Sequence, residues 1–141
     1  MTSEMETALR EYYAAWNAHD VERIASFFTD DCVYDDVPMG APTHGKEELK
    51  ASWGAFFPTC PDFKIEVKAI FATGDRAGSE WVLSGTQPAD WPGMPNTGKG
   101  FSIAGASIME LQVHKIKRNS DYWDMVSMLT QLGVMSGSLP E

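Results

Sequence analysis

The chain has 141 residues, a length that suits one domain with its own core, so we expect residues 1–141 to form a single unit. The net charge of −9 argues against a nucleic-acid partner or an anionic membrane surface. No apolar run approaches the roughly 20 residues that cross a bilayer, and the N-terminus lacks a signal-peptide pattern. We therefore expect a soluble cytoplasmic protein in which Cys32 and Cys60 are free thiols.

The first part of the chain carries helical patterns. Residues 3–18 begin with a capping box and repeat apolar residues at helical spacing. A short second helix can start after Asp20, and a third can start at Gly45. The predicted inner faces of these helices are rich in aromatic residues: Tyr12, Tyr13, Trp16, Phe27, Phe28, Trp53, Phe56 and Phe57.

The rest of the chain has the alternation of strands. Strands are predicted at 32–37, 63–71, 77–87, 101–111 and 115–124. Alternation places Tyr34 and Asp36 on one face of the first strand, and Trp81 and Gln87 on one face of the third. Residues 88–98 hold three prolines and two glycines and are expected to form a loop, with Trp91 and Met94 as a lid, an interface or residues tucked against the body. The tail 134–141 is expected to fray.

The order of the elements indicates the fold class. Helices come first and strands meeting at hairpins follow, which predicts an α+β fold with a curved antiparallel sheet and the N-terminal helices packed on one face. A curved sheet capped by aromatic helices leaves a conical cavity, and such a cavity is the default ligand site.

Asp124 lies where the last strand is expected to enter a final helix that ends at Gly133. The position of Asp124 allows two roles. It can cap that helix by accepting backbone N–H groups, or it can be a general acid/base in the cavity, with its pKa raised by burial.

Other chemistries lack a motif in this sequence. His19, His44 and His114 are far apart, and none has a second ligand at metal-binding spacing. There is no phosphate-binding glycine loop and no nucleophile elbow. What remains is an apolar cavity with a few polar groups, which suits proton transfer on a carbonyl-bearing ligand. Its expected members are Tyr12, Tyr34, Asp36, Gln87, Asp124, Trp16, Trp53 and Trp81.

Several short motifs in order resemble the SnoaL-like polyketide cyclases of the nuclear-transport-factor-2-like superfamily. They are Tyr12-Tyr-Ala-Ala-Trp-Asn-Ala-His-Asp20, Gly45-Lys-Glu-Glu, Trp81-x-x-x-Gly-Thr-Gln87 and Tyr122-x-Asp124. The resemblance implies aldol-type ring closure by an aspartate at the end of the last strand, without metal or cofactor, on a hydrophobic small molecule. Asp124 matches that aspartate, and Tyr122 is expected beside it as a substrate contact. Gln87 stands where the family often has His, and Gln cannot titrate.

The chain is also similar to ketosteroid isomerases, especially over residues 12–40. Their oxyanion tyrosine falls on Tyr12, and their proton-shuttling aspartate falls on Asp36. Their second oxyanion acid should lie near Ser107–Ile108, where this sequence has no acid. A non-catalytic binding module stays open. An epoxide hydrolase would need an Asp–Arg–Asp cluster, and Arg118 is ~20 Å along a strand from Asp124.

The resemblance also implies a homodimer. The sequence agrees, because the predicted strand at 101–111 is apolar on both faces while the helices can cover one sheet face.

Overall fold

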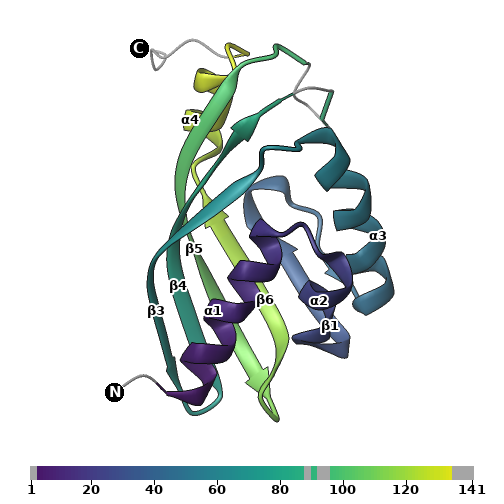
Figure 1. The fold of residues 1–141 in the computed structure, drawn as a ribbon, viewed down its shortest axis with the longest axis vertical. Helices are drawn as coiled ribbons and strands as arrows, with labels where there is room; N and C mark the ends of the chain where they lie inside the picture. Colours follow the sequence, from purple (N-terminus) through teal and green to yellow (C-terminus); the bar gives the residue numbers. More distant parts are fainter. Residues whose placement is uncertain (1–2, 88–89, 92–95, 135–141) are drawn as a thin grey trace.

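A computed structural model of the chain describes residues 3–87, 90–91 and 96–134. The helices are α1 (Glu4–Asn17), α2 (Val21–Ser26), α3 (Lys46–Phe56) and α4 (Met125–Gln131), with short 3-10 turns η1 (Val37–Met39) and η2 (Phe57–Thr59). The strands are β1 (Phe28–Asp36), β2 (Thr43–His44), β3 (Lys64–Thr73), β4 (Arg76–Thr86), β5 (Gly100–Gln112) and β6 (Lys115–Trp123) (Figure 1). The predicted loop at 88–98 and the tail at 134–141 lie partly outside the described residues.

Helix starts follow the capping residues that the sequence predicts. Ser3 accepts a hydrogen bond from the backbone N–H of Glu6, and Asp20 accepts one from Arg23, so each satisfies a donor that the first helical turn leaves open. Most predicted boundaries are displaced by one or two residues, and the start of β1 by four. Phe28 opens β1 rather than ending α2, because the chain turns at Phe27 and pairs with β6 at once.

The six strands form one sheet in the order β2-β1-β6-β5-β4-β3. All neighbours are antiparallel except β1 and β6, which run parallel. Two strands carry one extra residue: Lys68 in β3 and Lys117 in β6 have no partner in the register of the adjacent strand. Such bulges bend a strand and increase its twist, which accounts for much of the curvature of the sheet.

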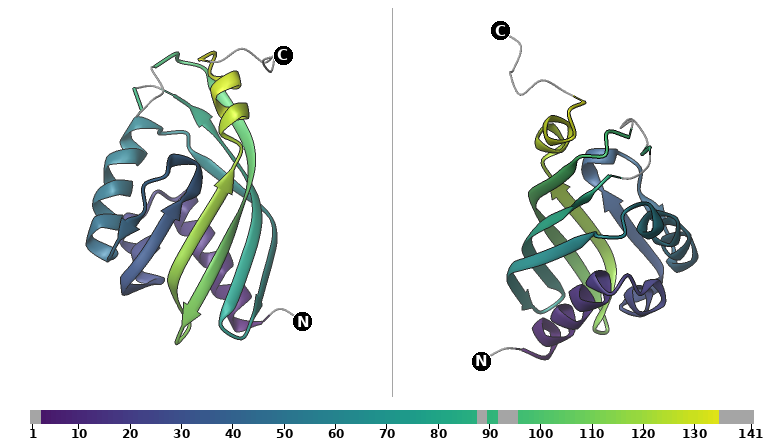
Figure 2. Two further views of the ribbon diagram at one scale, coloured as in Figure 1. Left: turned by 180° about the vertical axis from the view of Figure 1, so that it is seen from behind. Right: turned by 45° about the horizontal axis from the view of Figure 1, so that its top comes forward.

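The curved sheet has its concave side toward α1, α2 and α3, while α4 lies at one end of the strands (Figures 1 and 2). The predicted α+β cone is therefore the observed fold. The buried core includes Leu9 of α1, Phe28, Met109 and Ile116 of the sheet, and Leu132 at the end of α4. Within the described residues, no helix is both long and apolar enough to cross a membrane.

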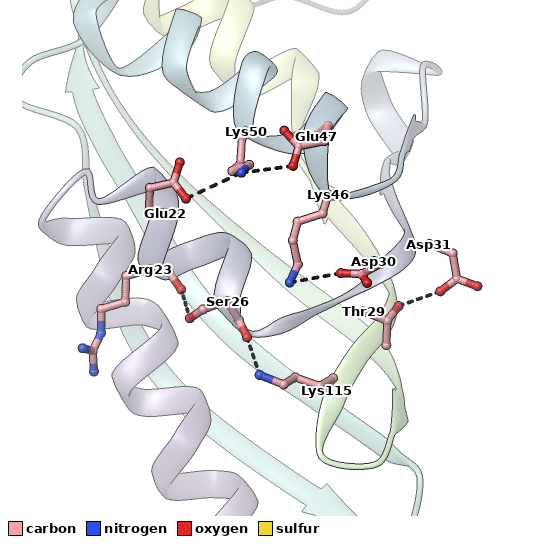
Figure 3. A network of polar contacts seen from close by, with 10 residues as sticks. All are labelled: Glu22, Arg23, Ser26, Thr29, Asp30, Asp31, Lys46, Glu47, Lys50 and Lys115. Atoms are coloured by element: carbon pink, nitrogen blue, oxygen red, sulfur yellow. Dashed lines mark hydrogen bonds and ion pairs between the residues drawn. The ribbon is translucent and has the colours of Figure 1, made fainter.

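The outer side of the helical layer carries exposed polar contacts (Figure 3). Lys50 bridges Glu22 of α2 and Glu47 of its own helix, and Lys46 pairs with Asp30 of β1. Because their carboxylate partners are largely exposed, each pair contributes little stability. They place the partly exposed lysines of α3 on the outer side of the helix.

Candidate active site

A cavity of about 310 Å³ opens between the helical layer and the concave face of the sheet, a volume at the lower end of the range for small-molecule sites. Its wall is mostly aromatic. The rings come from every layer of the fold: Tyr12, Tyr13, Trp16, Tyr34, Trp53, Phe56, Phe63, Trp81, Trp91, Phe101 and Trp123. These rings pack edge to face, as in Trp16 against Trp53, whose centroids are 4.1 Å apart.

A row of polar residues crosses the concave face at one register. Ser79 of β4 pairs with Ser107 of β5, Ser107 pairs with Asp121 of β6, and Asp121 pairs with Asp36 of β1. Three of the four, all except Ser79, line the cavity. The row places two carboxyl groups side by side in an otherwise apolar wall.

Asp121 is the most buried of the cavity carboxyls and is held by three donors. Its Oδ1 accepts hydrogen bonds from Ser107 Oγ at 2.6 Å and Asn119 Nδ2 at 2.7 Å, and its Oδ2 accepts one from the Tyr34 hydroxyl. Ser107 in turn accepts from the indole N–H of Trp81 at 2.9 Å. Burial raises the pKa of Asp121, and it outweighs the opposing effect of the three hydrogen bonds. The network fixes the orientation of the carboxyl group, and burial keeps it more basic than an exposed aspartate.

Asp36 is less enclosed. It lies at the end of β1 and accepts a hydrogen bond from the indole N–H of Trp123 at 2.8 Å. Burial raises the pKa of Asp36 to about 6, and the neighbouring Asp121 adds to the rise. A carboxyl group with this pKa changes its charge just below neutral pH, as a general base or a charge-sensing group would need to.

Two hydrogen-bond donors of α1 lie next to each other at the cavity. Tyr12 and Trp16 are one helical turn apart, and the Trp16 indole lowers the pKa of the Tyr12 hydroxyl, although burial dominates and raises it well above its usual value. The Trp16 N–H is buried and has no acceptor of normal geometry among the described residues. Buried donors without acceptors are rare and costly, which marks this pair as a candidate binding point for a ligand oxygen.

The structure brings six of the predicted site residues to the cavity wall: Tyr12, Trp16, Tyr34, Asp36, Trp53 and Trp81. Three other predicted residues do not line the cavity: Gln87, Tyr122 and Asp124. Gln87 is buried beside residues 97–99, where its amide oxygen accepts from Thr97. Tyr122 lies on the convex face with half of its side chain exposed.

The predicted placement of Asp124 in the cavity is wrong. Asp124 is exposed and is the N-cap of α4, where it accepts hydrogen bonds from the backbone N–H of Ser127 at 3.0 Å and from its hydroxyl at 2.6 Å. These bonds hold the pKa of Asp124 below its usual value, whereas the cavity prediction required a raised one. The capping interpretation, which the sequence also allowed, is the one that the structure has.

The sequence reasoning missed Asp121 because of the bulge at Lys117. Strict alternation from buried Ile116 places even-numbered residues inside, including Tyr122 and Asp124. The extra residue shifts the parity by one, so Asp121 and Trp123 line the cavity instead, and Asn119 lies on the same face and donates to Asp121. A signal in the sequence was Ser107, a polar residue on the otherwise apolar alternating face of its strand, and in the sheet it lies opposite Asp121.

Metal ligation has no support in the described part of the chain, where no group of three or more His, Cys, Asp or Glu side chains is arranged to hold an ion. Cys32 and Cys60 are both free and buried.

Comparison with known proteins identifies the family. The sequence profile of the SnoaL-like polyketide cyclases matches residues 6–132. The chain belongs to this family. A SnoaL-like protein from Shewanella denitrificans has a TM-score of 0.84 at 17% identity, with 95% of this chain and 100% of that one covered. IdmH from Streptomyces antibioticus gives 0.77 at 24% identity, with coverage of 93% and 99%.

A third solved structure comes from Catenulispora acidiphila. It is a protein with a ketosteroid isomerase-like fold in complex with trimethylamine, with a TM-score of 0.79, 21% identity, and coverage of 99% of this chain and 100% of that one. At these identities, the likeness of the three structures establishes the shared cone fold.

Proposed function

We propose that this SnoaL-like protein is an acid/base enzyme that closes a ring in a hydrophobic, carbonyl-bearing small molecule by an aldol-type step. The observation that carries the proposal is the placement of Asp121, a buried carboxyl group held by three donors at the wall of an aromatic cavity. Family membership supports the reaction class. Asp121 takes the role that the sequence suggested for Asp124.

The proposed reaction begins with proton abstraction. Ionised Asp121 removes a proton from the carbon next to a ligand carbonyl, and the C–H electrons move into an enolate. Three of the roughly four lone-pair sites of the carboxylate are already occupied by donors, which leaves one to receive the proton. The raised pKa of Asp121 increases its basicity toward carbon.

The enolate then needs a donor near its oxygen. Tyr12 and Trp16 supply a hydroxyl and an indole N–H from consecutive turns of α1. The enolate carbon attacks a second carbonyl of the same molecule, a C–C bond forms, and the new alkoxide takes the proton back from Asp121. The sum is a cyclisation in which Asp121 returns to its starting state.

Proton abstraction can be tested without the natural substrate. We would follow hydrogen–deuterium exchange of 2-tetralone in deuterated buffer by NMR, with wild type, Asp121→Asn and Asp124→Asn. Asp121→Asn should lose roughly two to four orders of magnitude of the catalysed exchange, and Asp124→Asn should keep it. Unchanged exchange in a folded Asp121→Asn protein would contradict the proposal.

An isomerase-like role for Asp36 is the second candidate, favoured by its pKa of about 6 and its place at the end of β1. In that case Asp36 would move a proton between two carbons of one ligand. Conversion of androst-5-ene-3,17-dione to the conjugated enone, abolished in Asp36→Asn but kept in Asp121→Asn, would support this role. Saturable ligand binding without exchange or isomerisation would instead indicate a binding module.

A further inference from the structure

The cavity combines carboxyl groups and aromatic rings with no positive side chain. Among the described residues no Lys, Arg or His lines it, although Asp36 and Asp121 both do. Buried carboxyl groups in proteins usually have a cationic partner or ligand. Here the protein supplies only neutral donors to both.

The nearby cations are committed elsewhere. Asp35, the neighbour of Asp36 in β1, points to the other face of the sheet and pairs with Arg118 at 3.1 Å. Lys46 and Lys50 pair with carboxylates on the outer side of the helices, and Lys115 donates to the Ser26 carbonyl (Figure 3). One strand thus carries two adjacent aspartates, of which only the outward one has a protein counter-ion.

We propose that the cavity binds ligands that carry an alkylated ammonium group, with Asp36 as the counter-ion and the aromatic wall as its surroundings. Aromatic faces attract ammonium groups through the ring quadrupole, and the attraction grows when the cation is removed from water. The proposal deepens the proposed function, on which it rests for the identity of the ligand site, and it adds a class of substrate: a carbonyl compound with an amine cation.

Asp36 suits this role better than Asp121. Asp121 is held by three donors, whereas Asp36 accepts from the Trp123 indole and from the backbone N–H of Met39. Asp36 is also partly accessible, while Asp121 is almost wholly buried. The net charge of −9 further favours the approach of cations over anions.

The test compares two probes of the same shape. Choline carries a trimethylammonium group, and 3,3-dimethylbutan-1-ol replaces its nitrogen by carbon and is neutral. We would measure binding of each to the full chain by calorimetry and tryptophan fluorescence at constant ionic strength, with sodium chloride as a control for unspecific cation effects. Wild type should bind choline about tenfold more tightly or better, which corresponds to ~1.4 kcal/mol.

Two variants distinguish the effect of the cavity carboxyl group on choline binding from an effect of surface charge in general. Asp36→Asn keeps the size of the side chain and should remove the preference for choline. Asp35→Asn removes the same charge from the opposite face of the strand and should keep it. Because the preference is also measured in wild type, a poorly folded variant does not decide the outcome.

The pH dependence gives a second readout. The titratable groups that face Asp36 in the cavity are Asp121 from β6 and Tyr34 from β1, while Asp35 lies on the opposite face of β1 beside Arg118. The hydrogen-bond donors Trp123 and Met39 are neutral, so the charge of Asp36 follows its pKa of about 6. Choline affinity should fall about tenfold from pH 8 to pH 5, where Asp36 is protonated. The affinity of the neutral probe should stay nearly constant.

Equal or tighter binding of the neutral probe, or no binding of choline up to high millimolar concentration, would overturn the proposal. So would a choline preference that survives in Asp36→Asn. Choline has no enolisable carbonyl, so its binding is independent of proton abstraction. If the wild-type protein catalyses 2-tetralone exchange but does not prefer choline, the ligand class alone is refuted. If it prefers choline but does not catalyse the exchange, the reaction alone is refuted.

Discussion

Asp36 and Asp121 occupy the same register on the parallel strands β1 and β6. Both side chains therefore enter the cavity from neighbouring strands, and Asp121 disfavours the ionised form of Asp36. The parallel pairing of these two strands, in a sheet that is otherwise antiparallel, is what brings the two carboxyl groups together.

Both carboxyl groups should make the protein less stable as the pH rises. For an acid whose pKa is higher in the folded state, the unfolded chain loses its proton first, so ionisation favours unfolding. For Asp36 this effect develops from its ordinary value of 3.8 to about 6. Other acids such as Asp62 and Glu66 have lowered pKa values and act in the opposite sense.

The contribution of Asp36 is therefore measured as the difference in unfolding free energy between wild type and Asp36→Asn. Urea unfolding of wild type and Asp36→Asn between pH 4 and pH 7 should show that the variant gains stability relative to wild type as the pH rises. A constant difference across this range would mean that Asp36 is not raised in pKa in the folded protein.

Asp124 should behave as a helix cap. Asp124→Asn keeps an acceptor for the Ser127 backbone N–H and should melt close to wild type, whereas Asp124→Ala should lower the melting temperature by a few degrees because this N–H loses its partner. Both variants should keep the catalysed exchange of 2-tetralone. Thermal melts and exchange assays on the same preparations check the two statements, and loss of exchange in Asp124→Asn would restore a catalytic role to this residue.

Gly105 provides room for the cavity residue Trp81. A Cβ atom at this position would lie 2.5 Å from the Trp81 ring and 2.8 Å from the Tyr122 carbonyl oxygen, closer than atoms can approach. Gly105→Ala should therefore shift Trp81, disturb its bond to Ser107, and cost about 1–3 kcal/mol of unfolding free energy.

Gly54 is the matched control. It is an exposed residue of α3 with no atom near the position of a Cβ. Gly54→Ala should stabilise the protein by roughly 0.4–1 kcal/mol, because alanine restricts the unfolded chain and favours helix. Chemical denaturation of both variants tests the pair, and equal effects would show that the space above Gly105 is larger than the structure indicates.

The convex face of the sheet should mediate a homodimer. Phe71, Ile108 and Tyr122 lie on strands of this face with about half of each side chain exposed, next to Ala104. Large apolar side chains exposed together on one sheet face often mark a contact with a partner. Light scattering should give twice the 15.6 kDa monomer mass, and Ile108→Lys should shift the protein toward monomer. A 15.6 kDa species at micromolar concentration in wild type would count against the dimer.

Local patterns in the sequence were sufficient for much of the fold. Ser3 and Asp20 start the helices that they were predicted to cap, Gly133 follows α4 with a positive φ of 77°, and Tyr34 and Asp36 share the face that alternation assigned to them. These features depend on residues close together in the chain, so period and capping chemistry are enough to predict them.

The identity of the buried carboxyl group was decided by tertiary structure. A single unpaired residue, Lys117, moves Asp121 into the cavity and leaves Asp124 outside, and the parallel pairing of β1 with β6 places Asp36 beside Asp121. Alternation has a period of two, so one bulge reverses every later side chain of the strand, and neither the bulge nor the pairing partner is encoded within reach of a local pattern. The sequence alone therefore determined that aspartates would meet an aromatic cavity, and the register of the folded sheet determined which ones.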